Sequence, residues 1–409
     1  MGRTLLAKLA VVGAVVVASL ILSMPPGEKI SLGLDLRGGL HLVLEVQVDK
    51  AVEQSLERTA ETVRKDLLAA GAPIVAVEPY DLQGIRLLFR ELPEAAAVND
   101  AVLNALPFSQ AVEQSGEVWT YELPADELSQ IRSDAVNQAL EKIRNRVDAF
   151  GVSEPSISRQ GAQRIVVQLP GLEDAQRAID LIGRTAQLEF KLVQSLATNP
   201  NETAPAGTEI LYEKIKNPQT QLMVQGQAYI VERRAGLTGN MLADARALPD
   251  QYQFGQYYVQ MRLNSRGKRL FARLTQENVG RALAIVLDDT IFSAPVIQEP
   301  ILGGEAQITG TFTPEEARDL AIVLREGALP APVSIIENRT VGPSLGSDSI
   351  SRGLRSTMLG GVLVILFMLT YYRMSGLVAD VALGLNLLIL MGALALPGLG
   401  ATLTLPGIA

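Results

Sequence analysis

The sequence has no cysteine, and His41 is the only histidine among its 409 residues. Without cysteine the chain can form no disulfide, thiolate nucleophile or cysteine-ligated metal site, and one histidine excludes a multi-histidine metal site. A catalytic triad would have to use His41 itself. We therefore predict no catalytic residue, no metal site and no cofactor, and we expect His41 to be an ordinary strand residue.

Positive charge is also scarce. The chain carries 36 lysines and arginines against 44 aspartates and glutamates, which gives a net charge of −8. A nucleic-acid-binding protein is expected to present a basic surface. The charge balance therefore argues against nucleic acid as a partner.

Long apolar runs are missing from the middle of the chain and gather at its two ends. Three of them are predicted to span a membrane: residues 5–22, 356–372 and 377–396. Arg3 and Lys8 lie in or before the first run, which predicts a cytoplasmic N-terminus and an extracytoplasmic middle region. A signal peptide is the alternative, because the uninterrupted apolar core of this run is only about 14 residues long. No clear cleavage site precedes Met24, so an uncleaved anchor is favoured.

The middle region repeats one order of elements three times: strand, helix, strand, strand, helix, strand. The copies cover residues 40–114, 118–193 and 257–340, and residues 194–256 are less patterned. This order is typical of ferredoxin-like split βαβ units. The predicted fold class is α+β, with repeated ferredoxin-like βαββαβ units between transmembrane helices at both ends.

Several polar groups in the middle region are expected to have ordinary roles. Asp288 and Asp289 lie between two apolar strands and predict a turn rather than an acid–base pair. Lys142, Arg144 and Arg146 lie on the helix that ends at Gly151, whose apolar stripe is already accounted for, and they are expected to form a solvated face.

Two polar residues fall in the last apolar run. Asp380 is a candidate for a proton path or a subunit contact, although it lies near the cytoplasmic interface, where a solvated carboxylate is the simpler interpretation. Asn386 lies nearer the middle of the span and is expected to bind a neighbouring helix. The glycines predicted to allow close helix packing are Gly360, Gly361, Gly384 and Gly392.

Seven motifs resemble those of the SecD family. They are GLDLRGG at 33–39, NRVDAFGVSEP at 145–155, QLPG at 168–171, IGRTAQLEF at 182–190, LREGALPAP at 324–332, VGPSLG at 341–346 and LTLPGIA at 403–409. They occur in the family's order over essentially the whole chain. The residues assigned by this resemblance to structural family motifs are Gly33, Asp35, Arg37, Gly38, Gly39, Arg146, Gly151, Glu154, Pro155, Pro170, Gly171, Gly342 and Pro343.

The resemblance implies a multi-pass subunit of the bacterial inner membrane, in contact with membrane lipid and carrying a large periplasmic region. It implies that the proton-motive force is used to assist late translocation and release of preproteins, together with a SecF-like subunit and the SecYEG channel. Similarity to the resistance-nodulation-division transporters is also implied. The alternative is a membrane-anchored periplasmic scaffold that binds preproteins without proton coupling of its own.

A membrane-proximal base and a mobile head are implied for the periplasmic region. The expected divisions are 1–29 for the cytoplasmic tip and first span, 30–114 for the first part of the base, 115–256 for the head, 257–350 for the second part of the base, and 351–409 for the remaining spans.

The sequence departs from the family after LTLPGIA. SecD proteins normally continue into a fourth span with an aspartate that is thought to carry protons, and this segment lies beyond Ala409. A fragment, a truncated gene and a split family member would each account for this departure.

Overall fold

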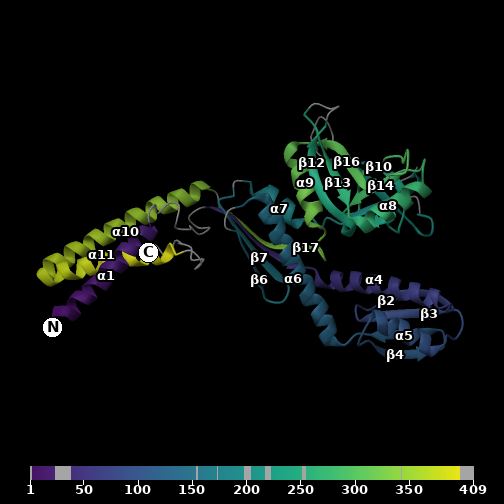
Figure 1. Ribbon diagram of the computed structural model, residues 1–409, viewed down its shortest axis with the longest axis horizontal. Helices are drawn as coiled ribbons and strands as arrows, with labels where there is room; N and C mark the ends of the chain where they lie inside the picture. The colour runs from purple at the N-terminus through teal and green to yellow at the C-terminus, as the bar shows by residue number, and fades with distance from the viewer. Residues whose placement is uncertain are drawn as a thin grey trace.

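The computed structural model describes residues 2–23, 38–152, 155–172, 174–197, 204–216, 223–250, 255–341 and 343–396. Figure 1 shows an elongated molecule, with a bundle of helices at one end and mixed helix and strand units at the other. The mixed helix and strand content of the predicted fold class is confirmed.

The three predicted apolar runs form helices α1 (Gly2–Ser23), α10 (Pro343–Tyr372) and α11 (Met374–Leu394), which lie side by side in Figure 1. Two segments, Ser351–Tyr372 and Met374–Leu394, are long and apolar enough to cross a membrane, and the apolar part of α1 is shorter. The chain reverses between α10 and α11 at Arg373, where φ is 50°.

The sheet nearest the bundle has the strand order β17-β1-β7-β6, and all its pairs are antiparallel. Helices α6 and α7 pack against it. We call this part the proximal unit: β1 (Gly39–Val46), α6 (Ala125–Phe150), β6 (Ser156–Gln160), β7 (Arg164–Pro170), α7 (Ala175–Gly183) and β17 (Val333–Val341). In chain order these elements make one βαββαβ unit.

Residues 48–122 form a separate body, the lateral unit, with the strand order β2-β3-β5-β4 and its own hydrophobic core. The only tryptophan of the chain, Trp119, is buried in this core. The elements are α4 (Val48–Ala69), β2 (Ile74–Tyr80), β3 (Gly84–Phe89), α5 (Ala95–Ala105), β4 (Gln110–Ser115) and β5 (Val118–Glu122).

Residues 188–326 form the distal unit, and α8 and α9 pack with its two sheets. In the larger sheet β10 pairs with both β9 and β8, which closes five strands into a small barrel. The barrel strands are β8 (Leu188–Leu196), β9 (Thr208–Lys216), β10 (Met223–Glu232), β14 (Leu283–Leu287) and β15 (Thr290–Ser293). The other elements are β11 (Leu237–Thr238), the 3₁₀ helix η1 (Gly239–Met241), β12 (Leu242–Pro249), β13 (Tyr257–Leu263), α8 (Ser265–Glu277), β16 (Glu305–Phe312) and α9 (Pro314–Glu326).

The predicted elements occur in the expected order, but they are not grouped as three successive copies. Strand β1 pairs with β7 and β17, and not with the strands of the lateral unit. The expected boundary at 114/115 separates β4 from its partner β5, and that at 256/257 separates β12 from β13. Alternating burial fixes which face of a strand is buried but not which strand lies beside it, so the pattern could not supply these partners.

A buried cation lies inside the barrel. The Lys191 side chain is 6% exposed, and its Nζ lies 2.7 Å from Glu189 Oε2 and 2.5 Å from Glu209 Oε1. Burial acts to lower the pKa of Lys191, but the hydrogen bonds and charges of the two glutamates outweigh it and raise the pKa above its usual 10.5. The folded state therefore favours the charged lysine. This contribution is complete below pH 10.5 and is lost only as the pH rises through the higher folded value.

Replacing Lys191 by methionine is expected to lower the free energy of unfolding by about 2–3 kcal/mol at pH 8, because two carboxylates then face each other without a cation. Thermal unfolding followed by circular dichroism measures the effect. The variant K191M/E189Q/E209Q, which lacks all three charges, should recover most of the loss. A triple variant as unstable as Lys191→Met would contradict the electrostatic account.

Candidate functional site

Two short segments connect the proximal and distal units. Residues 184–187 lead from α7 into β8, and residues 327–332 lead from α9 into β17. The two run beside each other, because the Leu329 amide donates to the Thr185 carbonyl over 2.8 Å. We call them the hinge segments. Movement of the distal unit relative to the proximal unit would have to bend both.

Arg146 of α6 contacts both hinge segments from the side of the proximal unit. Its side chain is fully buried. Nη1 donates to the carbonyls of Leu181 and Ile182, each over 3.3 Å, and to that of Arg184, while Nη2 donates to the Gly327 carbonyl over 3.0 Å. The first three acceptors are at the end of α7 and the start of one hinge segment, and the last begins the other. One planar guanidinium therefore ties both connections together.

The buried guanidinium of Arg146 keeps its positive charge. Burial lowers the pKa of Arg146 to about 10, and the charges of Asp288 and Glu326 act in the opposite direction. Since a pKa of about 10 is well above neutral, the guanidinium stays charged at physiological pH. The end of α7 supplies carbonyls that lack helical partners, and a cation at a helix C-terminus is favourable.

The expected solvated face on α6 is wrong for two of its three residues. Arg146 is buried, and Lys142 donates to the Glu326 carbonyl beside the hinge. Only Arg144 is exposed, and it donates to the Ile157 carbonyl over 3.2 Å. The reason is tertiary: α7 and α9 pack over the last turns of α6 and cover a side that the helix pattern alone assigns to solvent.

The turn predicted at Asp288 and Asp289 is confirmed. Both residues have positive φ, 49° and 58°, and they join β14 to β15. The turn has a second role that the sequence did not indicate. The Asp288 carboxylate accepts hydrogen bonds from the Ala186 and Gln187 amides, over 3.1 and 2.9 Å, and so fixes a hinge segment from the distal side.

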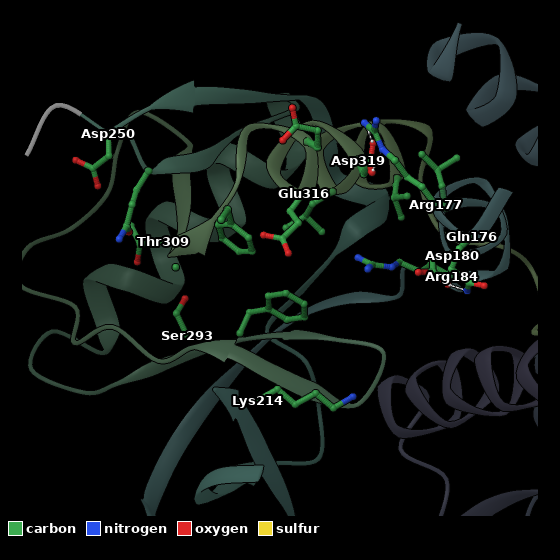
Figure 2. Close-up of a pocket in the computed structure, with 18 of the residues that line it drawn as sticks. Gln176, Arg177, Asp180, Arg184, Lys214, Asp250, Ser293, Thr309, Glu316 and Asp319 are labelled. Atoms are coloured by element: carbon green, nitrogen blue, oxygen red, sulfur yellow. Dashed lines mark hydrogen bonds and ion pairs between the residues drawn. The ribbon is translucent and has the colours of Figure 1, made fainter. Parts of the chain in front are cut away.

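A cleft of about 820 Å³ lies beside the hinge, between α7 of the proximal unit and α9, β15 and β16 of the distal unit (Figure 2). Arg177 of α7 reaches Asp319 of α9 with two hydrogen bonds, Nε to Oδ2 at 2.7 Å and Nη2 to Oδ1 at 2.8 Å. The hydrogen bond to Asp319 raises the pKa of Arg177. This bidentate pair joins two walls of the cleft and is a second tie between the units.

The cleft is lined by acidic and aromatic side chains. Seven carboxylates face three cations: Asp174, Asp180, Glu213, Asp250, Glu315, Glu316 and Asp319 against Arg177, Arg184 and Lys214. The rings of Phe292 and Phe312 stack with centroids 6.5 Å apart. None of these residues was predicted as part of a site. The only sequence signal was acid at the starts of α7 and α9, which helix N-termini favour anyway.

Two predicted motifs meet at one end of the proximal sheet. Gly39 is the first residue of β1 and lies opposite Pro170 at the end of β7. The Gly171 amide donates to the Gly38 carbonyl over 2.9 Å. The last two glycines of the GLDLRGG motif and the end of the QLPG motif thus close this end of the sheet together.

The remaining motif residues lie apart from this junction. Gly151 ends α6 in the left-handed conformation, with φ of 87°, and Pro155 precedes β6. Pro343 begins α10. His41, as expected, is a strand residue, and its Nδ1 lies 3.2 Å from Gln168 Nε2. The predicted residues outside the described part of the chain are Gly33, Asp35, Arg37, Glu154 and Gly342.

In the helix bundle, close packing is confirmed at Gly392. A Cβ there would lie 2.6 Å from Ser19 Cα of α1. At Gly360, Gly361 and Gly384 nothing within the described residues comes within 4 Å of such an atom. Asp380 is half-buried, and its Oδ2 is enclosed with no hydrogen-bond partner among the described atoms, whereas Asn386 is exposed.

Comparison with known families matches two regions of the chain. The family model described as SecDF, P1 head subdomain, matches residues 209–331, and the model described as protein translocase subunit SecDF, P1 domain, N-terminal, matches residues 136–195. The first match covers most of the distal unit. The second covers the C-terminal part of α6, the proximal elements β6, β7 and α7, and most of β8.

Individual relatives match over nearly the whole chain. The protein translocase subunit SecD of Desulfurispirillum indicum is 46% identical and covers 100% of this chain and 79% of its own length. That of Calditerrivibrio nitroreducens is 44% identical and covers 97% of this chain and 77% of its own. The crystal structure of SecDF, a translocon-associated membrane protein, from Thermus thermophilus is 31% identical over 99% of this chain and 45% of that one, with a TM-score of 0.43. Because these SecD relatives are 44–46% identical over nearly the whole chain, the chain belongs to the SecD family of protein translocase subunits.

Proposed function

We propose that the chain is an inner-membrane subunit that uses the proton-motive force to assist late translocation and release of preproteins on the periplasmic side. A SecF-like subunit and the SecYEG channel are its proposed partners. The observation that carries the proposal is the hinge. Two chain segments join the distal unit to the proximal unit. Polar contacts of Arg146, Asp288 and the pair Arg177–Asp319 hold these segments, while α9 also packs against α6 and α7.

In this proposal the distal unit is the mobile head and the proximal unit is the membrane-anchored base. The match of the P1 head model to residues 209–331 supports the first assignment. The direct continuation of β17 towards α10 supports the second. A ferredoxin-like description is proposed for the proximal unit alone. Asp380, with an enclosed carboxylate oxygen in α11, is the proposed proton-path residue of the described spans.

Locking the head to the base tests this function. Because the chain has no cysteine, the variant R177C/D319C places its only two thiols across the cleft, at positions whose native side chains meet. A reversible bifunctional thiol reagent then bridges them. In membrane vesicles containing the translocase, crosslinking should abolish the part of preprotein export that a protonophore also abolishes, and reduction should restore it.

A matched control places the same bridge within the distal unit. Glu232 and Arg281 also form an ion pair, at 3.3 Å, but both lie on the head side of the hinge. Crosslinking E232C/R281C should leave export unchanged. Export that stays normal with R177C/D319C verifiably crosslinked would remove head movement from the mechanism and favour the anchored preprotein-binding scaffold.

A further inference from the structure

The charge of the cleft between α7 and α9 limits what it can bind. Its seven carboxylates and three cations give a formal charge of −4, and Asp319 already neutralises one cation, Arg177. Figure 2 shows Arg184 and Lys214 approaching from different sides, with Glu316 between the walls. A ligand with positive charge would be attracted into this space, and an acidic ligand would be repelled.

The cleft also offers apolar contacts. The rings of Phe292 and Phe312 are nearly parallel, with an interplanar angle of 18°, and both are half-buried. Leu320 and Val323 of α9 continue this apolar surface. Such a wall suits an aromatic or aliphatic side chain, and the volume of about 820 Å³ is that of an ordinary ligand site.

Two features of the wall suit an extended backbone. Strand β16 is the last strand of its sheet, and Thr309 and Gly310 at its free edge line the cleft. An extended chain can add to such an edge through main-chain hydrogen bonds. Ser293, which Figure 2 shows on the opposite wall, has a buried hydroxyl without a hydrogen-bond partner among the described atoms. Because this oxygen is enclosed, a peptide group would reach it only after a local rearrangement of the Ser293 side chain.

We propose that this cleft binds extended polypeptide segments in which lysine or arginine adjoins an aromatic residue, and that it discriminates against acidic segments. The proposal deepens the proposed function and takes from it only that an unfolded polypeptide reaches the distal unit. Carboxylates select the cation, the phenylalanine pair holds its apolar neighbour, and the β16 edge holds the backbone.

The test uses the full chain in detergent and three fluorescent peptides of about ten residues, which extend to roughly 33 Å. The first alternates phenylalanine and lysine with serine spacers, the second has glutamate for each lysine, and the third has serine for each phenylalanine. We expect the first to bind about tenfold more tightly than the second at low salt. This preference should shrink at about 0.5 M salt, and the third peptide should bind several-fold more weakly than the first.

Two charge variants locate the preference. D180N/E213Q/E315Q removes three carboxylates of the cleft and should bring the first two peptides to within about twofold of each other. E277Q/D289N/E299Q removes three carboxylates of the same unit outside the cleft and should keep the tenfold preference. Equal binding of the first two peptides to the unmodified chain, or a preference that survives D180N/E213Q/E315Q, would overturn the inference.

The two proposals can fail separately. If the peptide preference is found but the R177C/D319C bridge leaves export unchanged, the cleft binds as inferred and the moving head is wrong. If the bridge stops export but the preference is absent, the head moves and its client contact lies elsewhere.

Discussion

Replacing Arg146 by methionine is expected to lower the free energy of unfolding of the proximal and distal units by about 3–5 kcal/mol. Methionine fills part of the space but donates no hydrogen bond. The carbonyls of Leu181, Ile182 and Gly327 then stay buried without their present donor. Each such group costs about 1–3 kcal/mol, partly offset because a buried charge is also removed. The hinge segments should loosen before the rest unfolds, since both lose the contact that joins them.

Hydrogen exchange and thermal unfolding measure these two effects. The non-proline amides of residues 184–187 and 327–332 should exchange faster in the variant than in the unmodified protein, and this increase should exceed that of the β1–β7 amides. Arg146→Lys keeps the charge but lacks the planar guanidinium group, so it should recover only part of the lost stability. Arg144→Met is the control on the same helix, because Arg144 is exposed and its loss should cost less than about 0.5 kcal/mol.

The lateral unit supplies an internal reference for the same measurement. Trp119 is the only tryptophan and lies in a core separate from that of the hinge. Its fluorescence transition should therefore stay close to that of the unmodified protein while the hinge segments loosen. If Arg146→Met unfolds like Arg144→Met and exchanges no faster at the hinge, Arg146 is not the tie that holds the connections.

The order of elements could be predicted from the sequence, but their partners could not. Alternating apolar residues indicated β1, and helical spacing indicated α6, each to within a few residues. The neighbours of β1 are β7 and β17, the latter almost 300 residues away, and nothing in the alternation of a strand specifies such a partner. The weakly patterned residues 194–256 became β9, β10 and β12 because barrel closure and sheet pairing stabilise them.

The residues of the candidate site could not be predicted from the sequence. Arg146 adjoins Val147 of the apolar stripe on α6, but its residue type and the helical pattern both indicated solvent, and only the packing of α7 and α9 against α6 buries it. Arg177 and Asp319 are 142 residues apart and belong to units whose docking decides their contact. One sequence gives no sign of such a pair.

The junction of Gly39 with the QLPG motif predicts a second large effect. Gly39 has a φ of 130°, a backbone angle that residues with a Cβ rarely adopt. A Cβ at this position would lie 2.2 Å from the Leu169 carbonyl oxygen and 3.0 Å from Pro170 Cα, both backbone atoms that cannot rotate away. Gly39→Ala therefore combines backbone strain with a steric clash, each of which costs about 1–3 kcal/mol.

The total expected loss for Gly39→Ala is about 3–5 kcal/mol in the stability of the proximal unit. Strand pairing at the start of β1 should be lost on both sides, because Gly39 pairs with Pro170 of β7 and with Val341 of β17. Exchange at Leu40 and Leu42 amides measures the loosening, and thermal unfolding by circular dichroism measures the total.

Gly161→Ala is the matched control for Gly39→Ala. Gly161 lies in the turn between β6 and β7 of the same sheet, with a φ of 67°, and nothing lies within 4 Å of a Cβ placed there. It carries only ordinary left-handed strain and no clash, so its loss should be about 1 kcal/mol. The difference between the two variants measures the clash with β7 together with the greater backbone strain at a φ of 130°. Equal losses would mean that neither the φ of Gly39 nor its close approach to β7 costs more than the replacement of an ordinary left-handed glycine.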